Sequence, residues 1–482
     1  MLFNSIDFAI FLPVIFCLYW FVANRNLNLQ NILIVASSYF FYGCWDWRFL
    51  SLLFFSSIFD YSIGRAFLIT NDNNKRKLLL WFSILINLGI LSFFKYFNFF
   101  ISNFVSVFTF FGYSIQANTL EIILPIGISF YTFQSLSYTI DVYNRKLEPT
   151  KNIIEFLAFV SFFPQLVAGP IERAINLLPQ FHQPRIFNYE KAVDGSKQIL
   201  WGLLKKIVIA DNCAYYANQI FNNPDNYSGS TLVLGALFFT FQIYCDFSGY
   251  SDIAIGTSRL FGFNLMKNFA FPYFSRDIAE FWRRWHISLS TWFRDYLYVP
   301  LGGSRGSLLF NARNVFIVFI VSGFWHGANW TFIVWGLLNA IYFLPLLLLK
   351  QNRNNMDAVA SGKLLPSFKD FLSITLTFSL TVFAWIFFRA QSLPHAFRYI
   401  EKIFSASLFY IPNFNFLEKD FIFIFILISF VFFEWLGREN EYAIQKTNAK
   451  SSRYIRWSFY YAIIFIILIF NGKDEPFIYF QF

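Results

Sequence analysis

A histidine stands inside a lipid-soluble stretch of the sequence, in the segment Ser322–Trp330, SGFWHGANW. The chain has only 4 histidines, and this one, His326, lies between Trp325 and Gly327. An ionisable group inside a membrane segment is expensive and is usually functional, and neutral imidazole is well suited to accept a proton near pH 7. The alternative is a structural histidine hydrogen-bonded between helices that small residues such as Gly323 allow to approach closely. The residues alone leave both interpretations open.

A second histidine, His286, stands in the segment Glu280–Arg305, EFWRRWHISLSTWFRDYLYVPLGGSR. Tryptophan and tyrosine alternate here with Arg283, Arg284, Arg294 and Asp295. This composition favours an interfacial helix held by an aromatic belt. An anchor needs neither a histidine nor the sharp PLGG turn, so the segment is also a candidate site. Its charges predict that the region Asp277–Arg305 lies at the membrane surface or re-enters it, and does not cross.

Two carboxylates, Asp246 and Asp252, interrupt an apolar run in the segment Tyr244–Gly256, YCDFSGYSDIAIG. Together with the serines and glycines between them they predict a broken helix. The break would either line a polar cavity or use the aspartates as caps of two half-helices, and capping is the favoured interpretation.

Other common site patterns are absent from the sequence. It contains no GxSxG element, no phosphate-binding glycine loop and no HExxH element. The histidines do not have the spacing of metal ligands, so we expect neither a metal nor a tightly bound cofactor; they are His182, His286, His326 and His395. The scattered cysteines, with no CxxC pair, are expected to be buried free thiols; they are Cys17, Cys44, Cys213 and Cys245.

Composition shows that the elements holding these residues must be membrane helices. The chain has 482 residues, of which 57% are hydrophobic and 14% charged, whereas a soluble protein carries roughly a quarter charged residues. One soluble core cannot absorb this apolar surface, so we predict an all-α polytopic membrane protein. The net charge of +10 fits cytoplasmic loops and lipid headgroups, and not nucleic acid, because the charges do not cluster in one basic domain.

Apolar runs predict about eleven or twelve membrane crossings, at roughly twenty residues each. The first, Ile6–Val22, follows no basic segment, so we expect it to be retained and not cleaved as a signal peptide. We find no internal repeat and no linker, so residues 1–482 are expected to form a single membrane domain. The candidate spans are 6–23, 30–44, 48–69, 78–100, 120–140, 153–169, 199–213, 231–262, 314–330, 331–349, 371–390, 421–437 and 457–470.

The charge of the loops predicts an orientation. The short basic loops Asn71–Lys77 and Asn144–Lys151 are expected to be cytoplasmic, as is the basic loop Arg438–Arg456. A single apolar run, Trp457–Phe470, separates that last loop from the tail, residues 473–482. The tail is therefore expected on the outer, periplasmic face of a bacterial cytoplasmic (inner) membrane.

Four segments together resemble the membrane-bound O-acyltransferase (MBOAT) family. They are FPQLVAGPIER, YCDFSGYSDIAIG, NFAFPYFSRDIAEFWRRWHISLSTWFRDYLYVPLGG and SGFWHGANWTFIVWG, and they extend from about Phe162 to Gly336. Their order, spacing and residue identities agree with the family, and the apolar opening MLFNSIDFAIFLPVIF resembles the same branch. That branch contains bacterial proteins similar to the alginate O-acetylation protein.

The resemblance implies a fold and two site residues. The family fold is a ring of transmembrane helices around a thinned centre, where a tunnel brings donor and acceptor together. The histidine of the WHG element is the family's catalytic one, which here is His326. The histidine of RRWHIS is the supporting one, which here is His286.

The tail carries a further candidate, Tyr479. Some systems of this branch have an aromatic element, Phe-x-Tyr-x-x-Phe, on the acyltransferase or on a small partner, and Phe477–Phe482 matches it. A phenol has a pKa near 10, so attack by Tyr479 needs a base. His326 would be that base if the tail folded back into the tunnel, with Phe477, Phe480 and Phe482 docked on its walls. We therefore expect Tyr479 to be a transient acyl carrier; incidental terminal aromatics are the alternative.

The function implied is transfer of an acyl group, most simply acetyl, to an extracytoplasmic polysaccharide such as an alginate-like exopolysaccharide or peptidoglycan. The donor would be acetyl-CoA or another acyl thioester, and the partner a secreted SGNH-type acetyltransferase or esterase. The alternatives are a transporter or flippase of a lipid-linked saccharide, and a lipid or protein O-acyltransferase. Transporters often have two matching halves with paired broken helices, whereas one such cluster is found here, between Phe162 and Gly336.

Overall fold

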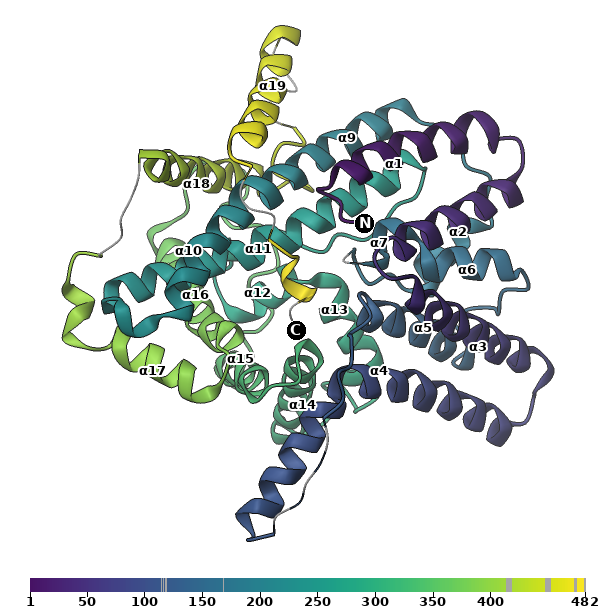
Figure 1. Ribbon diagram of the computed structural model, residues 1–482, viewed down its shortest axis with the longest axis horizontal. Helices are drawn as coiled ribbons and strands as arrows, with labels where there is room; N and C mark the ends of the chain where they lie inside the picture. The colour runs from purple at the N-terminus through teal and green to yellow at the C-terminus, as the bar shows by residue number, and fades with distance from the viewer. Residues whose placement is uncertain are drawn as a thin grey trace. The chain divides into compact units, whose positions relative to one another are not determined.

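The computed structural model of the chain is all-helical (Figure 1). It describes residues 1–482 except 114, 116, 118, 168, 413–417, 447–451, 472–474 and 481–482. The chain forms two compact units, one of Met1–Val193 with Thr257–Met266 and the other of Asp194–Gly256 with Lys267–Phe482. All three predicted site residues belong to the second unit.

The first unit is organised around a buried helix, α5 (Ile128–Tyr143), which contacts α3 and α4. Nearly every side chain of α5 is buried. Its other helices are α1 (Ile6–Cys17), α2 (Leu27–Gly43), α3 (Leu50–Ile69), α4 (Asn73–Phe110), α6 (Ile153–Ser161), α7 (Phe163–Leu166) and α8 (Ala174–Phe181).

The second unit contains the long helix α11 (Gly229–Leu260, of which residues 229–256 belong here) and the antiparallel pair α14 (Leu308–His326) and α15 (Trp330–Leu348). Its remaining α-helices are α9 (Tyr189–Leu203, from Asp194 onward), α10 (Asp211–Asn222), α12 (Ile278–Arg284), α13 (Ile287–Phe293), α16 (Phe368–Arg389), α17 (Leu393–Ile403), α18 (Glu418–Gly437) and α19 (Arg453–Ile469). Two shorter elements matter for the site: the π-helical turn η3 (Leu204–Ala210) and the 3-10 turn η8 (Ile478–Phe480).

The protein is a multi-pass membrane protein. In the described part of the chain, 6 helices are long and apolar enough to cross a bilayer: Trp47–Ile69, Asn73–Phe110, Gly229–Leu260, Leu308–His326, Trp330–Leu348 and Phe368–Arg389. Ile6–Val22 and Phe421–Gly437 are shorter apolar helices. Predicted spans near these segments therefore correspond to real helices. The region Asp277–Arg305 contains only short helices, of which α12 and α13 have 7 residues each, too few to cross.

Two predicted spans have wrong bounds, and a third contains a π-helical turn. The span 120–140 fails at its start, because the helix begins at Ile128, after Pro125 and a left-handed Gly127 (φ 77°); proline disfavours helix in the residue before it. The span 153–169 ends at Ser161, before Pro164. The span 199–213 lies within a continuous helical stretch, in which the π-helical η3 joins α9 to α10.

The predicted break in α11 is also wrong. The helix is continuous from Gly229 to Leu260 through both aspartates. Instead of capping half-helices, the carboxylates of Asp246 and Asp252 pair with lysines of η3, at 2.9 and 2.5 Å. A Cβ on Gly249 would lie 2.8 Å from the carbonyl oxygen of Gly202. The glycine therefore permits close packing of two helices and does not mark a break.

The cysteines agree with expectation only in part. All four thiols are free, and Cys213 and Cys245 are buried as predicted. Cys17 and Cys44 are exposed, so that part of the prediction is wrong. In a membrane protein an apolar side chain beside a span needs no protein cover, because lipid surrounds it.

The pair α14–α15 packs closely where small residues were predicted to allow it. A Cβ on Gly323 would lie 2.3 Å from the carbonyl oxygen of Phe332, and one on Gly336 would lie 2.4 Å from that of Phe319. Between the helices, Gly327 is extended and the side chain of Asn329 caps α15 by accepting from the backbone N–H of Thr331 at 3.1 Å. This turn fixes His326 at the end of α14.

We expect Gly323→Ala to destabilise the protein by about 1 to 3 kcal/mol, because the new methyl group must push a backbone carbonyl away. Thermal unfolding in detergent measures this. The matched control is Gly89→Ala in α4, where a Cβ meets nothing within 4 Å and the helix should gain about 0.5 to 1 kcal/mol. Equal midpoints for the two variants would contradict the close packing.

Candidate active site

The three residues singled out in the sequence lie together in the second unit. The ring centroid of Tyr479 is 5.5 Å from that of His326 and 6.3 Å from that of His286. Along the chain, Tyr479 lies 153 positions after His326 and 193 positions after His286. Figure 1 shows how this happens: η8, drawn in yellow, lies beside α11 and away from α19, the helix that precedes it.

His326 stands at the C-terminus of α14 among aromatic rings. Its ring meets Trp335 of α15 edge-on at 5.2 Å and Phe388 of α16 at 5.3 Å, and its neighbour Trp325 at 5.0 Å. The residue is 3% exposed. Rings from two neighbouring helices therefore fix the imidazole plane and keep bulk water away, and the remaining side is occupied by Tyr479.

His286 is held by a left-handed backbone and by one asparagine. Its φ of 44° and ψ of 54° place it in the left-handed region, which costs energy in a residue other than glycine and is found mainly at functional positions. Its Nδ1 lies 3.0 Å from Oδ1 of Asn268. The edge of Phe247 of α11 contacts the ring at 4.6 Å.

The partners of Asn268 determine the tautomer of His286. The backbone N–H of Ser288 donates to Oδ1 of Asn268 at 3.3 Å, and the hydroxyl of Ser288 donates to the same atom at 2.9 Å. An atom that accepts from a backbone N–H is the amide oxygen, so Nδ1 of His286 must carry the hydrogen and donate to it. Nε2 of His286 is then left with its lone pair.

His286 is a neutral acceptor. Burial lowers the pKa of its imidazole from 6.5 to about 3, because a charged ring would lose its hydration. Its Nε2 is buried and has no hydrogen-bond partner among the described residues. A buried nitrogen with a free lone pair is what a bound donor, such as a substrate hydroxyl or an ordered water, would satisfy.

Tyr479 is half-buried, and its ring packs against α11 and against the tail itself. Its ring lies 4.5 Å from that of Phe247 and 5.6 Å from that of Phe477, which is fully buried. Burial raises the pKa of the Tyr479 phenol well above 10. Phe480 and Phe482 were also predicted to dock, but their side chains lie outside what the structure describes. The ring of Phe477 does pack against that of Tyr250, with centroids 4.4 Å apart.

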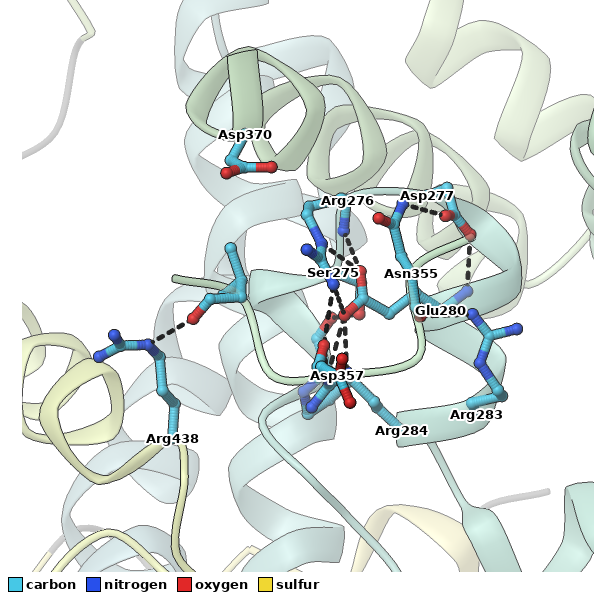
Figure 2. Close-up of polar contacts among 12 residues, drawn as sticks. Ser275, Arg276, Asp277, Glu280, Arg283, Arg284, Asn355, Asp357, Asp370 and Arg438 are labelled. Carbon is cyan, nitrogen blue, oxygen red and sulfur yellow. Dashed lines mark hydrogen bonds and ion pairs between the residues drawn. The ribbon is translucent and has the colours of Figure 1, made fainter. Parts of the chain in front are cut away.

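The arginines of the predicted interfacial segment bind the main chain of a loop. Arg283 donates to the backbone carbonyls of Asn352 and Asn355, both at 2.8 Å. Arg284 donates to the carbonyl of Asp357 at 2.9 Å and to the buried Glu280 at 3.1 Å. Figure 2 shows these side chains gathered on the chain that links α15 to α16.

Two further contacts complete this arrangement, since Arg276 reaches the same Asp357 carbonyl at 2.8 Å and Arg438 donates to Val359 at 2.8 Å. The arginines therefore bind backbone carbonyls of a loop, which composition alone could not predict. Arg294 differs from these arginines, since its exposed side chain pairs with the neighbouring Asp295 at 2.7 Å.

Sequence reasoning missed two members of the site. Asn268 lies in the segment that carries the family resemblance, but nothing in its neighbours indicates a contact with His286, 18 positions away. Phe247 was overlooked because the two aspartates on either side of it carried the interpretation of that segment. Its ring contacts both His286 and Tyr479. Spacing at helical periodicity would have put Phe247 on one face with Tyr250, and that face is the one that receives the tail.

Comparison with known proteins identifies the class. The model of the membrane-bound O-acyltransferase family matches residues 145–388, about half of the chain, including α11, both histidines and their supporting helices. The chain belongs to the membrane-bound O-acyltransferase family, as its motifs predicted, and it is an acyltransferase.

Individual relatives extend over most of the sequence. A probable alginate O-acetylase AlgI of Pseudomonas aeruginosa is 40% identical over 86% of this chain and 77% of its own. The protein of the same description from Pseudomonas putida is 36% identical, and the match covers 100% of both chains. A peptidoglycan O-acetyltransferase of Helicobacter pylori is 36% identical over 83% of this chain and 79% of its own.

The role of Asn268 can be tested with Asn268→Leu, which keeps the size of the side chain and removes the acceptor. We expect the hydrogen of His286 to redistribute between Nδ1 and Nε2, and acyl transfer to fall by about 10- to 100-fold, the effect of one lost interaction of 1.4 to 2.8 kcal/mol. ¹⁵N NMR of the imidazoles measures the tautomer directly, and 4 histidines make the assignment simple.

The control is Asn311→Leu, another asparagine of the same unit, near the start of α14. It should leave the ¹⁵N shifts of His286 unchanged. An unchanged tautomer in Asn268→Leu would contradict the assignment.

Proposed function

We propose that the protein transfers an acetyl group from an acyl thioester, such as acetyl-CoA, to an extracytoplasmic polysaccharide of the alginate or peptidoglycan type. The observation that carries the proposal is the position of the Tyr479 phenol ring, 5.5 Å from the ring of His326 and 6.3 Å from that of His286. The similarity over the full chain to a probable alginate O-acetylase, and over most of the chain to a peptidoglycan O-acetyltransferase, supports the acceptor class and the acetyl group.

In the first step, the Tyr479 oxygen attacks the carbonyl carbon of the thioester. Its proton passes to His326, the C–S bond breaks, and the leaving thiolate takes the proton to leave as a thiol. Burial raises the pKa of Tyr479 well above 10, so a free phenolate would be scarce and proton removal must accompany attack. The product is an aryl acetate on Tyr479.

In the second step, a hydroxyl attacks that ester. The C–O bond to the phenol breaks, and the proton of the hydroxyl returns through His326 to Tyr479. The attacking group is a polysaccharide hydroxyl or the serine of a secreted SGNH-type partner. A phenol is a better leaving group than an alcohol, so the tyrosyl ester remains an activated donor. One transfer is thereby divided into two easier ones.

His286 supports these steps as a neutral acceptor. Its pKa of about 3 keeps the ring uncharged at physiological pH, and its Nε2 lone pair is available to a donor. It would orient a water or the incoming hydroxyl, whereas His326 moves the proton.

The loop charges support an orientation for this chemistry. With Lys75 at the start of α4 and the loops around Lys146 and Lys446 in the cytoplasm, the tail lies at the periplasmic face of the bacterial inner membrane, as the acceptor requires. We also propose the family arrangement, a ring of about eleven or twelve crossings around a tunnel, in one membrane domain of 482 residues. Membrane lipid is then the solvent of the ring, and the acyl donor enters from the cytoplasmic side.

The rival functions have less support. A transporter or flippase would not need an aromatic-lined histidine against a tyrosine ring, and α11 is continuous and not one of two paired broken helices. A lipid or protein O-acyltransferase uses the same chemistry, and the acceptor found in the relatives argues for polysaccharide.

We expect His326→Ala to lower acetyl transfer by about 100- to 10,000-fold, because a positioned general base is lost. Transfer of labelled acetyl from the thioester to polysaccharide, by the purified protein in proteoliposomes with its partner, measures the rate. The control is His395→Ala in α17, outside the aromatic site, which should retain activity. A near-normal rate in folded His326→Ala would rule out the assignment.

Tyr479→Phe keeps the ring and removes only the hydroxyl. We expect the acetyl adduct on the C-terminal peptide, detected by mass spectrometry, to disappear together with polymer acetylation, while the protein stays folded. Tyr454→Phe, at an 85% exposed tyrosine, should behave as the parent. Normal polymer acetylation by Tyr479→Phe would exclude the carrier role and leave that of His326 standing.

A further inference from the structure

A buried lysine in the second unit is shared by two carboxylates. The ammonium of Lys206, in η3, lies 2.7 Å from Oδ1 of Asp211 and 2.9 Å from Oδ1 of Asp246. Lys206 is 1% exposed, and both aspartates are buried. A buried carboxylate needs a donor for each of its oxygens, so Asp246 requires a second partner beyond the lysine.

The tail backbone supplies that partner. The backbone N–H of Ile478 donates to Oδ2 of Asp246 at 2.7 Å. Three residues earlier, the carbonyl of Glu475 accepts from the ammonium of Lys206 at 3.0 Å. The tail therefore gives one donor and one acceptor of its main chain to the same ion pair.

A second ion pair lies beside the first, and among the described residues its aspartate is completed by a glutamine and not by the tail. Lys205 and Asp252, the neighbours of Lys206 and Asp246 on the same two elements, pair at 2.5 Å. The other oxygen of Asp252 accepts from the side chain of Gln198 at 2.8 Å. This pair joins η3 to α11. The two pairs differ in the group that donates to the second carboxylate oxygen, which is the Ile478 amide for Asp246 and the Gln198 side chain for Asp252.

We propose that Lys206 and Asp246 form a backbone-recognising latch that docks the tail of this chain in one register, with Tyr479 at the two histidines. Ile478 is the residue before Tyr479, so the latch fixes the position of the phenol directly. Shifting the tail by one residue would place the amide of Phe477 or of Tyr479 at Asp246 in place of that of Ile478, and would move the phenol away from His326. The purpose of the latch rests on the proposed role of Tyr479 as an acyl carrier, whereas the docking of the tail does not depend on that role.

Hydrogen exchange at the Ile478 amide tests the latch. The full-length protein in detergent is incubated in D₂O and then digested. The deuterium content of the peptide that contains residues 475–482 is measured by mass spectrometry. We expect Asp246→Asn, which keeps shape and weakens the acceptor, to accelerate exchange of this peptide by about 10- to 100-fold, the loss expected for a charge-assisted hydrogen bond. Equal protection in Asp246→Asn and the parent would overturn the proposal.

The matched control is Asp252→Asn, the same change in the neighbouring ion pair on the same helix. Its tail should exchange at the parental rate, and acceleration equal to that of Asp246→Asn would overturn the proposal, since any disturbance of α11 would then suffice. Tyr479→Phe should also retain parental protection. Because no donor or acceptor is present, this readout is independent of acyl transfer.

A tail-side variant keeps the proposal testable if Asp246→Asn does not fold. Ile478→Pro removes the donated N–H and leaves both ion pairs intact, and Ile478→Val keeps the N–H and most of the side chain. We expect the amides of Tyr479 and Phe480 to exchange at least about 10-fold faster in Ile478→Pro than in Ile478→Val. The same rate in both variants would overturn the latch.

Discussion

Two adjacent ion pairs between η3 and α11 hold the surface on which the site is built. Lys205 and Lys206 reach Asp252 and Asp246 from a π-helical turn, where one extra residue per turn lets consecutive lysines point to the same neighbouring helix. Charges of this kind are tolerated inside a membrane protein only when each is paired. Because α11 is fixed in this way, the ring of Phe247 stands against both His286 and the tail.

From this surface the remaining parts of the site follow by contact. The α14–α15 pair brings His326 and Trp335 together because Gly323 and Gly336 let two backbones touch. The segment after α11 brings Asn268 to His286. The arginines of α12 bind the loop between α15 and α16, so the helix that supports His286 and the helices around His326 belong to one connected network.

The motifs that resemble the family drew attention to His286, His326 and Tyr479, and the structure brings their rings together; their roles in catalysis stay a prediction. The sequence was sufficient to predict membrane helices as well, since apolar length alone carries that information. It could not show that α11 is continuous. Serine, glycine and aspartate in one segment indicate a break in a helix. Here, however, lysines elsewhere in the chain pair with the aspartates, and a neighbouring backbone packs against the glycine. The lysines belong to η3 and the neighbouring backbone is that of Gly202 in α9, both some forty to fifty residues earlier. The partner of Asn268 and the loop held by Arg283 are long-range contacts of the same kind.

The left-handed backbone of His286 also affects how this position can be studied. A residue other than glycine at φ 44° has a strained backbone conformation. Alanine is poorly suited to that region, whereas asparagine adopts it readily. Replacing His286 by alanine would therefore change main-chain strain and imidazole chemistry at once. Asparagine would preserve the conformation while withdrawing the aromatic nitrogen. A substitution at position 286 must therefore meet two separate requirements, one for the backbone conformation and one for the imidazole chemistry, and few amino acids meet the first.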